Sequence, residues 1–214
     1  MRKVMIVGAG GRAGRAATAE AVRRGHAVTA VVREPARHQD LAGPGVALVA
    51  GDVTDADALA TLAAGHDAVV AAVYDSSSTD PHRFFVATAH ALTDGLARAG
   101  VTRLVWVGLA PLLPTSDGTL LGDTEGYPDE HRGFFLAHAA ATRAFDTATG
   151  LDWVALSPSG DFDHGGTPSG GYATAPGDAD SRITYADFAR ALLDEVDEPR
   201  TFRAHVGVEA ASAP

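Results

Sequence analysis

Short, nearly continuous apolar runs alternate along this chain with longer segments of helical pattern. The runs are rich in Val and predict strands covered on both faces: Val4–Val7, Val28–Val32, Val46–Val49, Ala68–Val73, Leu104–Val107 and Trp153–Leu156. The Ala-rich segments between them have high helix propensity and predict helices at Ala13–Arg24, Ala56–Ala63, Phe84–Ala99 and Phe134–Ala148. Strands that alternate with crossover helices are typical of a parallel sheet.

Glycine stands where each of these helices should end, at Gly25, Gly65, Gly100 and Gly150, as expected for residues just beyond a helix. A later helix at Tyr185–Val196 and a short strand at Phe202–Val208 complete the pattern. We therefore predict one Rossmann-type α/β domain over residues 1–214. Its sheet is doubly wound and mainly parallel, with helices on both faces and a small C-terminal extension on the substrate side.

Two segments rich in Gly and Pro interrupt the alternation, residues 109–130 and 158–181. Each follows the carboxyl end of a predicted strand, which is where open α/β sheets bind ligands. Long loops inside a compact domain usually carry function, so we predict that both are substrate-side loops. The serine run at residues 76–79 is predicted to be a loop over the cofactor.

Composition narrows the possible partners. With 46% hydrophobic and 21% charged residues the chain is not disordered, and 17 basic against 27 acidic residues give a net charge of −10. This charge opposes nucleic-acid and anionic-membrane binding, and no apolar run reaches the roughly 18 residues that span a bilayer. The absence of cysteine excludes disulfides and thiolate chemistry. We expect a cytoplasmic protein, a monomer or homodimer, without nucleic-acid or membrane partners.

The most specific motif follows the first strand and opens the first helix: Gly8-Ala9-Gly10-Gly11-Arg12-Ala13-Gly14. In this position it is typical of a dinucleotide-binding loop, since Gly8 permits a tight turn and Gly14 lets the helix pack closely. Gly10 and Gly11 would let backbone amides approach a pyrophosphate at the helix N-terminus, together with Arg12 and Ala13. The alternative is an ordinary turn in a Gly-rich chain.

The end of the second strand favours NADP(H) over NAD(H). Arg33 and Arg37 would converge on a 2′-phosphate, although a solvated Arg33 is the alternative and Glu34 keeps NAD(H) possible. Asp52 and Val53 follow the third strand and would contact the adenine edge, unless Asp52 only caps the next helix.

Later strand ends add further candidates. Beside the nicotinamide we expect Ala72, Val73, Tyr74 and Gly108, and beside the substrate Leu109, Ala110, Pro158 and Ser159.

Together these segments resemble the atypical short-chain dehydrogenase/reductase superfamily, in its NAD(P)H-binding, NmrA-like group, which includes NADH-flavin reductases and biliverdin reductase B. The resemblance covers nearly the whole chain, with these matching segments: 8–14, 31–35, 51–55, 65–69, 150–154, 157–158, 171–172 and 181–183. Two positions depart from the group, which usually has Thr at position 10 and often a substrate-contacting Ser at position 108. His138 resembles a family histidine near the substrate and is our candidate proton donor. A helix-surface histidine is the alternative, and His131 is a weaker candidate.

The reaction must proceed without the Tyr–Lys pair of ordinary short-chain dehydrogenases. Lys3, in the first strand, is the sole lysine, and the residues four beyond the four tyrosines are Ser78, His131, Pro176 and Ala189. A flavin, quinone or similar planar conjugated acceptor needs less acid assistance than a ketone, so we predict an NADPH-preferring reductase of such an acceptor. Alternatives are an NmrA-like redox sensor without turnover, or a natural-product epimerase or dehydratase. We predict no metal site, because the histidines lack ligand spacing.

Overall fold

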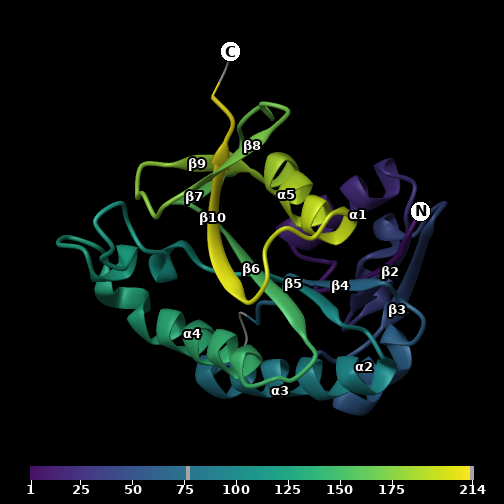
Figure 1. Cartoon of the computed structure of the whole chain (residues 1–214). Coiled ribbons are helices and arrows are strands. Elements are labelled where there is room, and N and C mark those ends of the chain that lie inside the picture. Colours follow the sequence, from purple (N-terminus) through teal and green to yellow (C-terminus); the bar gives the residue numbers. More distant parts are fainter. Residues whose placement is uncertain (76–77, 213–214) are drawn as a thin grey trace.

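A sheet of eight strands runs through the computed structural model, which describes residues 1–75 and 78–212 (Figure 1). Across the sheet the order is β3-β2-β1-β4-β5-β6-β10-β8. All neighbouring strands are parallel except β8, which is antiparallel to β10. The strand bounds are β1 Lys3–Val7, β2 Ala27–Val32, β3 Val46–Ala50, β4 Ala68–Ala71, β5 Arg103–Val107, β6 Asp152–Pro158, β8 Tyr172–Ala175 and β10 Ala204–Ala210. The predicted doubly wound, mainly parallel α/β fold is confirmed.

Helices cover both faces of this sheet (Figure 1). On one face lie α1 (Arg12–Arg23) and α5 (Tyr185–Asp197), and on the other α2 (Ala56–Ala63), α3 (Pro81–Ala99) and α4 (Arg132–Asp146). A fully buried core separates each helical layer from the sheet, with Phe188 and Leu192 in the first and Phe85, Trp106 and Phe145 in the second. Within the described part of the chain, every helix is too short or too polar to cross a bilayer.

Local signals place the element ends well. Gly25, Gly65, Gly100 and Gly150 all have φ between 73° and 78°, the left-handed conformation that follows a helix end. Helix α3 starts three residues before the predicted Phe84, because the Asp80 side chain accepts a hydrogen bond from the Arg83 N–H (2.9 Å) and Pro81 takes the first helical position. In the predicted serine loop, Ser76 and Ser77 lie outside the described residues.

Segment 158–181 is not the unbroken loop that we predicted. It contains β8 and a short strand β7 (Asp161–Asp163), which pairs in parallel with β9 (Arg182–Thr184) as a small second sheet. Neither strand carries an apolar run, since β8 lies at the edge of the sheet and most of its residues are exposed or half-buried. Their hydrogen bonds come from strands further along the chain, which a local pattern cannot reveal.

One buried carboxylate fixes this segment to α5. Asp187 is fully buried and accepts hydrogen bonds from the backbone N–H of Ser169 (2.8 Å) and of Gly170 (3.0 Å). The Thr184 hydroxyl donates to the same carboxylate at 2.9 Å and caps the helix by accepting from the Asp187 N–H. Because a buried charge is tolerated only when it is well bonded, this carboxylate holds the turn before β8 in place.

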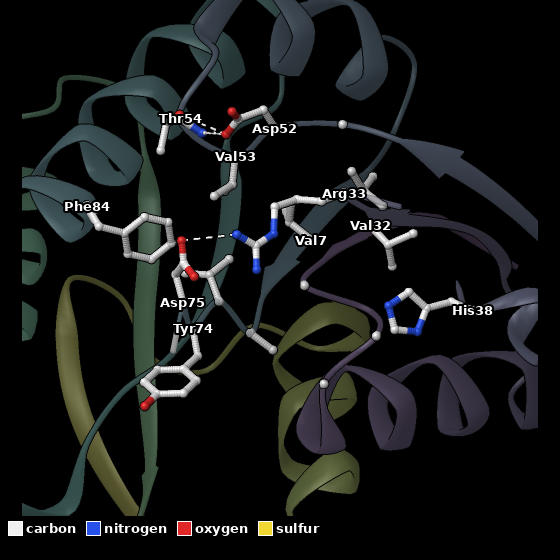
Figure 2. Close-up of a pocket in the computed structure, with 17 residues that line it drawn as sticks. Val7, Val32, Arg33, His38, Asp52, Val53, Thr54, Tyr74, Asp75 and Phe84 are labelled. Carbon is white, nitrogen blue, oxygen red and sulfur yellow. Dashed lines mark hydrogen bonds and ion pairs between the residues drawn. The ribbon is translucent and has the colours of Figure 1, made fainter. Parts of the chain in front are cut away.

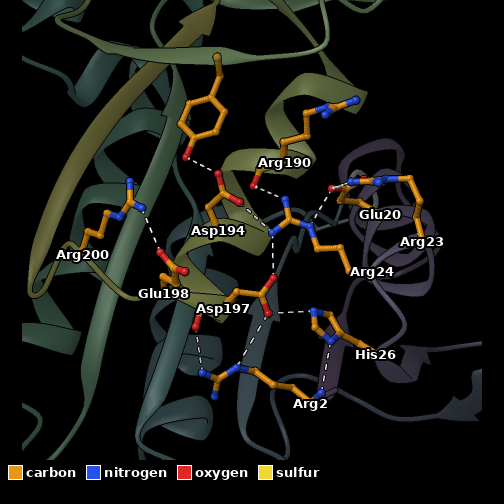
Figure 3. Close-up of polar contacts among 11 residues, drawn as sticks. Arg2, Glu20, Arg23, Arg24, His26, Arg190, Asp194, Asp197, Glu198 and Arg200 are labelled. Atoms are coloured by element: carbon orange, nitrogen blue, oxygen red, sulfur yellow. Dashed lines mark hydrogen bonds and ion pairs between the residues drawn. The ribbon is translucent and has the colours of Figure 1, made fainter.

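A second group of charges joins α1 to α5 (Figure 3). Arg24 forms ion pairs with Glu20 on its own helix at 2.8 Å and, on α5, with Asp194 at 2.8 Å and Asp197 at 2.9 Å. The Glu20 side chain is 8% exposed. Hydrogen bonds from Arg23, and then from Arg24, lower the pKa of Glu20 from 4.5 to about 2.

We expect Glu20→Gln to lower the free energy of unfolding near neutral pH by about 2 kcal/mol. A carboxylate whose folded-state pKa is depressed stabilises the fold above its unfolded pKa and loses that effect as pH falls. The deficit should therefore shrink from pH 4.5 toward 2. Urea unfolding near pH 7 and at about pH 3 measures it. Glu198→Gln, in an exposed pair with Arg200, serves as the control and should change little. A pH-independent deficit would contradict the assignment.

Candidate functional site

The first pocket opens between the carboxyl ends of β1 and β4, where the chain turns to opposite sides of the sheet and ligands of this fold bind. It is a cavity of about 320 Å³. The predicted cofactor residues that line it are Gly8, Gly10, Gly11, Arg33, Asp52, Val53, Ala72, Val73 and Tyr74 (Figure 2). Residues from the ends of four neighbouring strands therefore share one cavity.

Three backbone segments meet at the glycines of the first loop. A side chain on Gly8 (φ 75°) would come closer than 3.0 Å to the Ala72 carbonyl, and one on Gly14 would do the same to the Gly8 carbonyl. At Gly11, in contrast, a Cβ would meet only the Gly8 oxygen at 3.5 Å. Gly10 and Gly11 line the pocket immediately before α1 begins, so the N-terminus of this helix lies at the pocket, where a pyrophosphate can bind.

The far end of this pocket is polar. Arg33 lines it and donates to the Asp75 carboxylate at 3.0 Å (Figure 2). Arg37, predicted to work with Arg33, does not line the pocket and pairs with Glu34 at 2.9 Å. The short 3-10 turn Pro35–Arg37 carries the chain past this position and brings His38 to the pocket instead. The sequence analysis did not identify His38 as a pocket residue, because no local pattern distinguishes its position from that of Arg37.

Other predicted cofactor residues lie near the pocket rather than on its wall. Arg12 donates to His164 Nδ1 at 3.1 Å, which links the start of α1 to segment 158–181. Ala13 and Gly14 lie in the first turn of α1. Asp52 accepts from the N–H and hydroxyl of Thr54 at 2.8 and 2.7 Å. Since Asp55 caps α2, Asp52 remains available to the pocket.

The second pocket follows β5 and β6 on the same edge of the sheet. Its volume is about 530 Å³, a size that accommodates a small ligand. The predicted residues Gly108, Leu109, Ala110 and Pro158 line it. Gly108 was expected beside the cofactor and lies here instead. Ser159 is fully buried, lines neither pocket, and donates to the Ala175 carbonyl at 3.3 Å.

Three aromatic side chains form walls of this second pocket: Tyr127, Phe135 and Phe162. They come from segment 109–130, α4 and β7, so the two long segments that the sequence placed on the substrate side supply Tyr127 and Phe162. Burial, with a smaller contribution from the Asp161 charge, raises the pKa of Tyr127. Its hydroxyl therefore keeps its proton at neutral pH and can donate a hydrogen bond to a ligand. Tyr74 of the first pocket packs edge-on against Phe134, the residue before Phe135 on α4, with the ring centroids 5.6 Å apart.

His138 lies in the core, which argues against its predicted role as proton donor. Its ring is 3% exposed and packs against Phe85 at 4.5 Å and Trp106 at 5.1 Å, and it lines neither pocket. Burial lowers the pKa of His138 to about 3, so the ring is neutral at pH 7. The Trp106 indole N–H donates to His138 Nδ1 at 3.4 Å. His131, the weaker candidate, is exposed and lines the second pocket.

The glycine at position 108 has a structural cause. A Cβ there would lie 2.6 Å from Ser157 Oγ and 2.7 Å from His205 Nε2. These two atoms are hydrogen-bonded to each other at 2.6 Å, and burial lowers the pKa of His205 to about 4. The Ser157–His205 pair thus takes the space that a side chain at 108 would occupy.

A Tyr–Lys pair cannot form at these pockets. Lys3 begins β1, and its backbone N–H donates to the Asp67 carboxylate at 2.7 Å. It therefore lies at the amino edge of the parallel sheet, whereas both pockets lie at the carboxyl edge. Among residues 1–75 and 78–212, no three His, Asp or Glu side chains gather as a metal site would require.

We expect Gly14→Ala to lower the unfolding temperature by several degrees, because the added methyl group meets the Gly8 backbone. A loss of about 2 kcal/mol would shift the midpoint of a chain of this size by roughly 4–8 °C. Gly11→Ala adds the same methyl group three residues earlier, where the space is open. This variant should shift the unfolding midpoint little. Thermal unfolding without ligand compares the two, and equal midpoints would refute the close packing.

Comparison with known proteins agrees with this geometry. The profile of the family described as NAD(P)H-binding matches residues 8–199. The uncharacterized protein YwnB of Bacillus subtilis (strain 168) is 33% identical over 205 residues, which cover 92% of this chain and 93% of YwnB. The structure of a "putative exported protein" from Burkholderia pseudomallei is 35% identical with a TM-score of 0.83, and the match covers 98% of this chain and 100% of the Burkholderia chain. The structure of a "putative NADH-flavin reductase" from Streptococcus pneumoniae TIGR4 is 27% identical with a TM-score of 0.80, and the match covers 99% of this chain and 100% of the Streptococcus chain. The chain has the fold of NAD(P)H-binding oxidoreductases and belongs to the NAD(P)H-binding family.

Proposed function

We propose that the protein is a reductase that prefers NADPH and transfers hydride to a flavin, a quinone or a similar planar conjugated acceptor. The observation that carries this proposal is the pair of pockets on one edge of the sheet. One has a glycine cradle for a dinucleotide, and the other, next to it, has aromatic walls and no Tyr–Lys acid. Similarity to a protein named as an NADH-flavin reductase supports the same chemistry.

In this proposal the first pocket binds and orients the dinucleotide. The N-terminus of α1, which follows Gly10 and Gly11 directly, binds the pyrophosphate, and Val53 packs against the adenine. Arg33 binds the 2′-phosphate after it exchanges its Asp75 partner for the ligand. When bound, the reduced nicotinamide supplies the hydride. Ala72 and Val73 at the end of β4 set its position relative to the second pocket.

The second pocket then orients the acceptor. Tyr127, Phe135 and Phe162 offer flat apolar surfaces, against which a conjugated ring system stacks favourably. Such an acceptor spreads the incoming charge over several atoms, so orientation contributes more to the rate than a strong acid does. The proton can come from water or from the Tyr127 hydroxyl, which its raised pKa keeps protonated.

We expect the purified protein to oxidise NADPH in the presence of FMN, riboflavin or short quinones, with saturation in the acceptor and a rate well above the protein-free rate. Absorbance of the reduced nicotinamide measures it. Tyr127→Phe keeps the aromatic wall and should lower the rate only modestly, whereas Tyr127→Ala should weaken acceptor binding more strongly. NADPH binding without oxidation by any acceptor would favour the NmrA-like sensor. No binding of either nicotinamide cofactor would refute the proposal.

We expect Arg33→Ala to lower the ratio of NADPH to NADH affinity by about tenfold, since a charge-assisted bond to a phosphate is lost. Arg37→Ala removes an arginine that is paired with Glu34 outside the pocket and should leave the ratio within about twofold. Calorimetric titration with each cofactor measures both variants. An unchanged ratio in Arg33→Ala would mean that this arginine does not contact the 2′-phosphate.

A further inference from the structure

The His38 ring lies against the glycine loop that follows β1, at Gly10. A Cβ at Gly10 would lie 2.6 Å from Cε1 and 2.7 Å from Nε2 of the His38 ring. The ring is half-buried and lines the first pocket, beyond Val32 and Arg33 in Figure 2. The imidazole thus rests on the loop at the place that a side chain on residue 10 would occupy.

Arg15 fixes the position and the tautomer of this ring. Its guanidinium forms an ion pair with Asp40, donates from Nε to the Gly10 carbonyl at 2.9 Å, and donates from Nη2 to His38 Nδ1 at 3.1 Å. A guanidinium can only donate, so Nδ1 is the acceptor and the proton of the neutral ring lies on Nε2. Within the described residues this Nε2–H has no hydrogen-bond partner.

Unlike the His38 Nε2–H, the arginines around this end of the pocket already have partners within the protein. Arg15, Arg33 and Arg37 each form an ion pair with one carboxylate, on Asp40, Asp75 and Glu34 respectively. A phosphate that binds an arginine here must compete with that carboxylate. The His38 Nε2–H can donate to a phosphate oxygen without breaking a bond in the protein.

We propose that His38 is a specificity-determining residue, whose Nε2–H donates to the 2′-phosphate of the adenosine half of the cofactor. The inference rests on the proposed NADPH preference and assigns part of it to a residue outside the arginine pair. His38 lines the pocket together with Val32 and Arg33 from the end of β2, which favours the 2′-phosphate over the pyrophosphate, since the ribose hydroxyls are bound at the end of the second strand. Gly10 permits the arrangement because it has no side chain.

Calorimetry with two small probes tests the assignment without turnover. Adenosine 2′,5′-bisphosphate and adenosine 5′-monophosphate differ only in the 2′-phosphate. We expect His38→Phe, which keeps the ring and removes the donor, to bind the bisphosphate about tenfold more weakly and the monophosphate with unchanged affinity. His38→Gln keeps an amide donor and should recover part of the loss. Gly10→Ala should displace the ring and reproduce the effect of His38→Phe.

His90→Phe, at an exposed position on α3, is the matched control and should bind both probes as the unsubstituted protein does. Equal weakening of both probes in His38→Phe would place the contact at the 5′-phosphate and overturn the proposal. Unchanged binding of both probes would overturn it as well. The protein could show the expected effect of His38→Phe and yet fail to oxidise NADPH with any of the acceptors tested. That result would support this inference and contradict the proposed function.

Discussion

The close approach of β1, β4 and α1 at their backbones is the constraint on which the first pocket depends. At Gly8 and Gly14 the distances leave no room for a Cβ, so any side chain there would push α1 away from the edge of the sheet. The N-terminus of α1 would then move away from the pocket that Gly10 and Gly11 line. The ion pairs of Arg24 with Asp194 and Asp197 join the other end of α1 to α5, so the helix is held at both ends.

Two histidines near the second pocket, His138 and His205, are part of the scaffold, and this limits the chemistry that they can support. His138 accepts from Trp106 in the core, and His205 is bonded to Ser157. Burial lowers the pKa of both rings far below 7, so neither carries an extra proton to donate at neutral pH. Lys3 lies at the opposite edge of the sheet. In the proposed reaction the rate enhancement comes mainly from orientation, which aromatic walls can supply, and His131 is the histidine that lines this pocket.

Most of the fold could be predicted because its signals are local. The six apolar runs, the Ala-rich helices and the four glycines after the helices each act within a few residues. Strands β7 and β8 could not, because their partners β9 and β10 come later in the chain. The site shows the same division. The glycine loop was recognisable from its spacing, whereas the contrast between Arg37 outside the pocket and His38 on its wall depends on the 3-10 turn Pro35–Arg37.

The two positions where the chain departs from the motifs that it resembles have a common physical basis. At Gly10 the missing side chain makes room for His38, and at Gly108 it makes room for the Ser157–His205 pair. In each case a polar side chain from a neighbouring segment occupies the volume that the motif residue would fill. Both rings are half-buried, but the His38 Nε2–H has no hydrogen-bond partner among the described residues, whereas His205 Nε2 is bonded to Ser157 Oγ. A glycine at a motif position can thus move a polar contact to another part of the chain, and the hydrogen bonds that the replacing group makes within the protein decide whether it keeps a donor for a ligand.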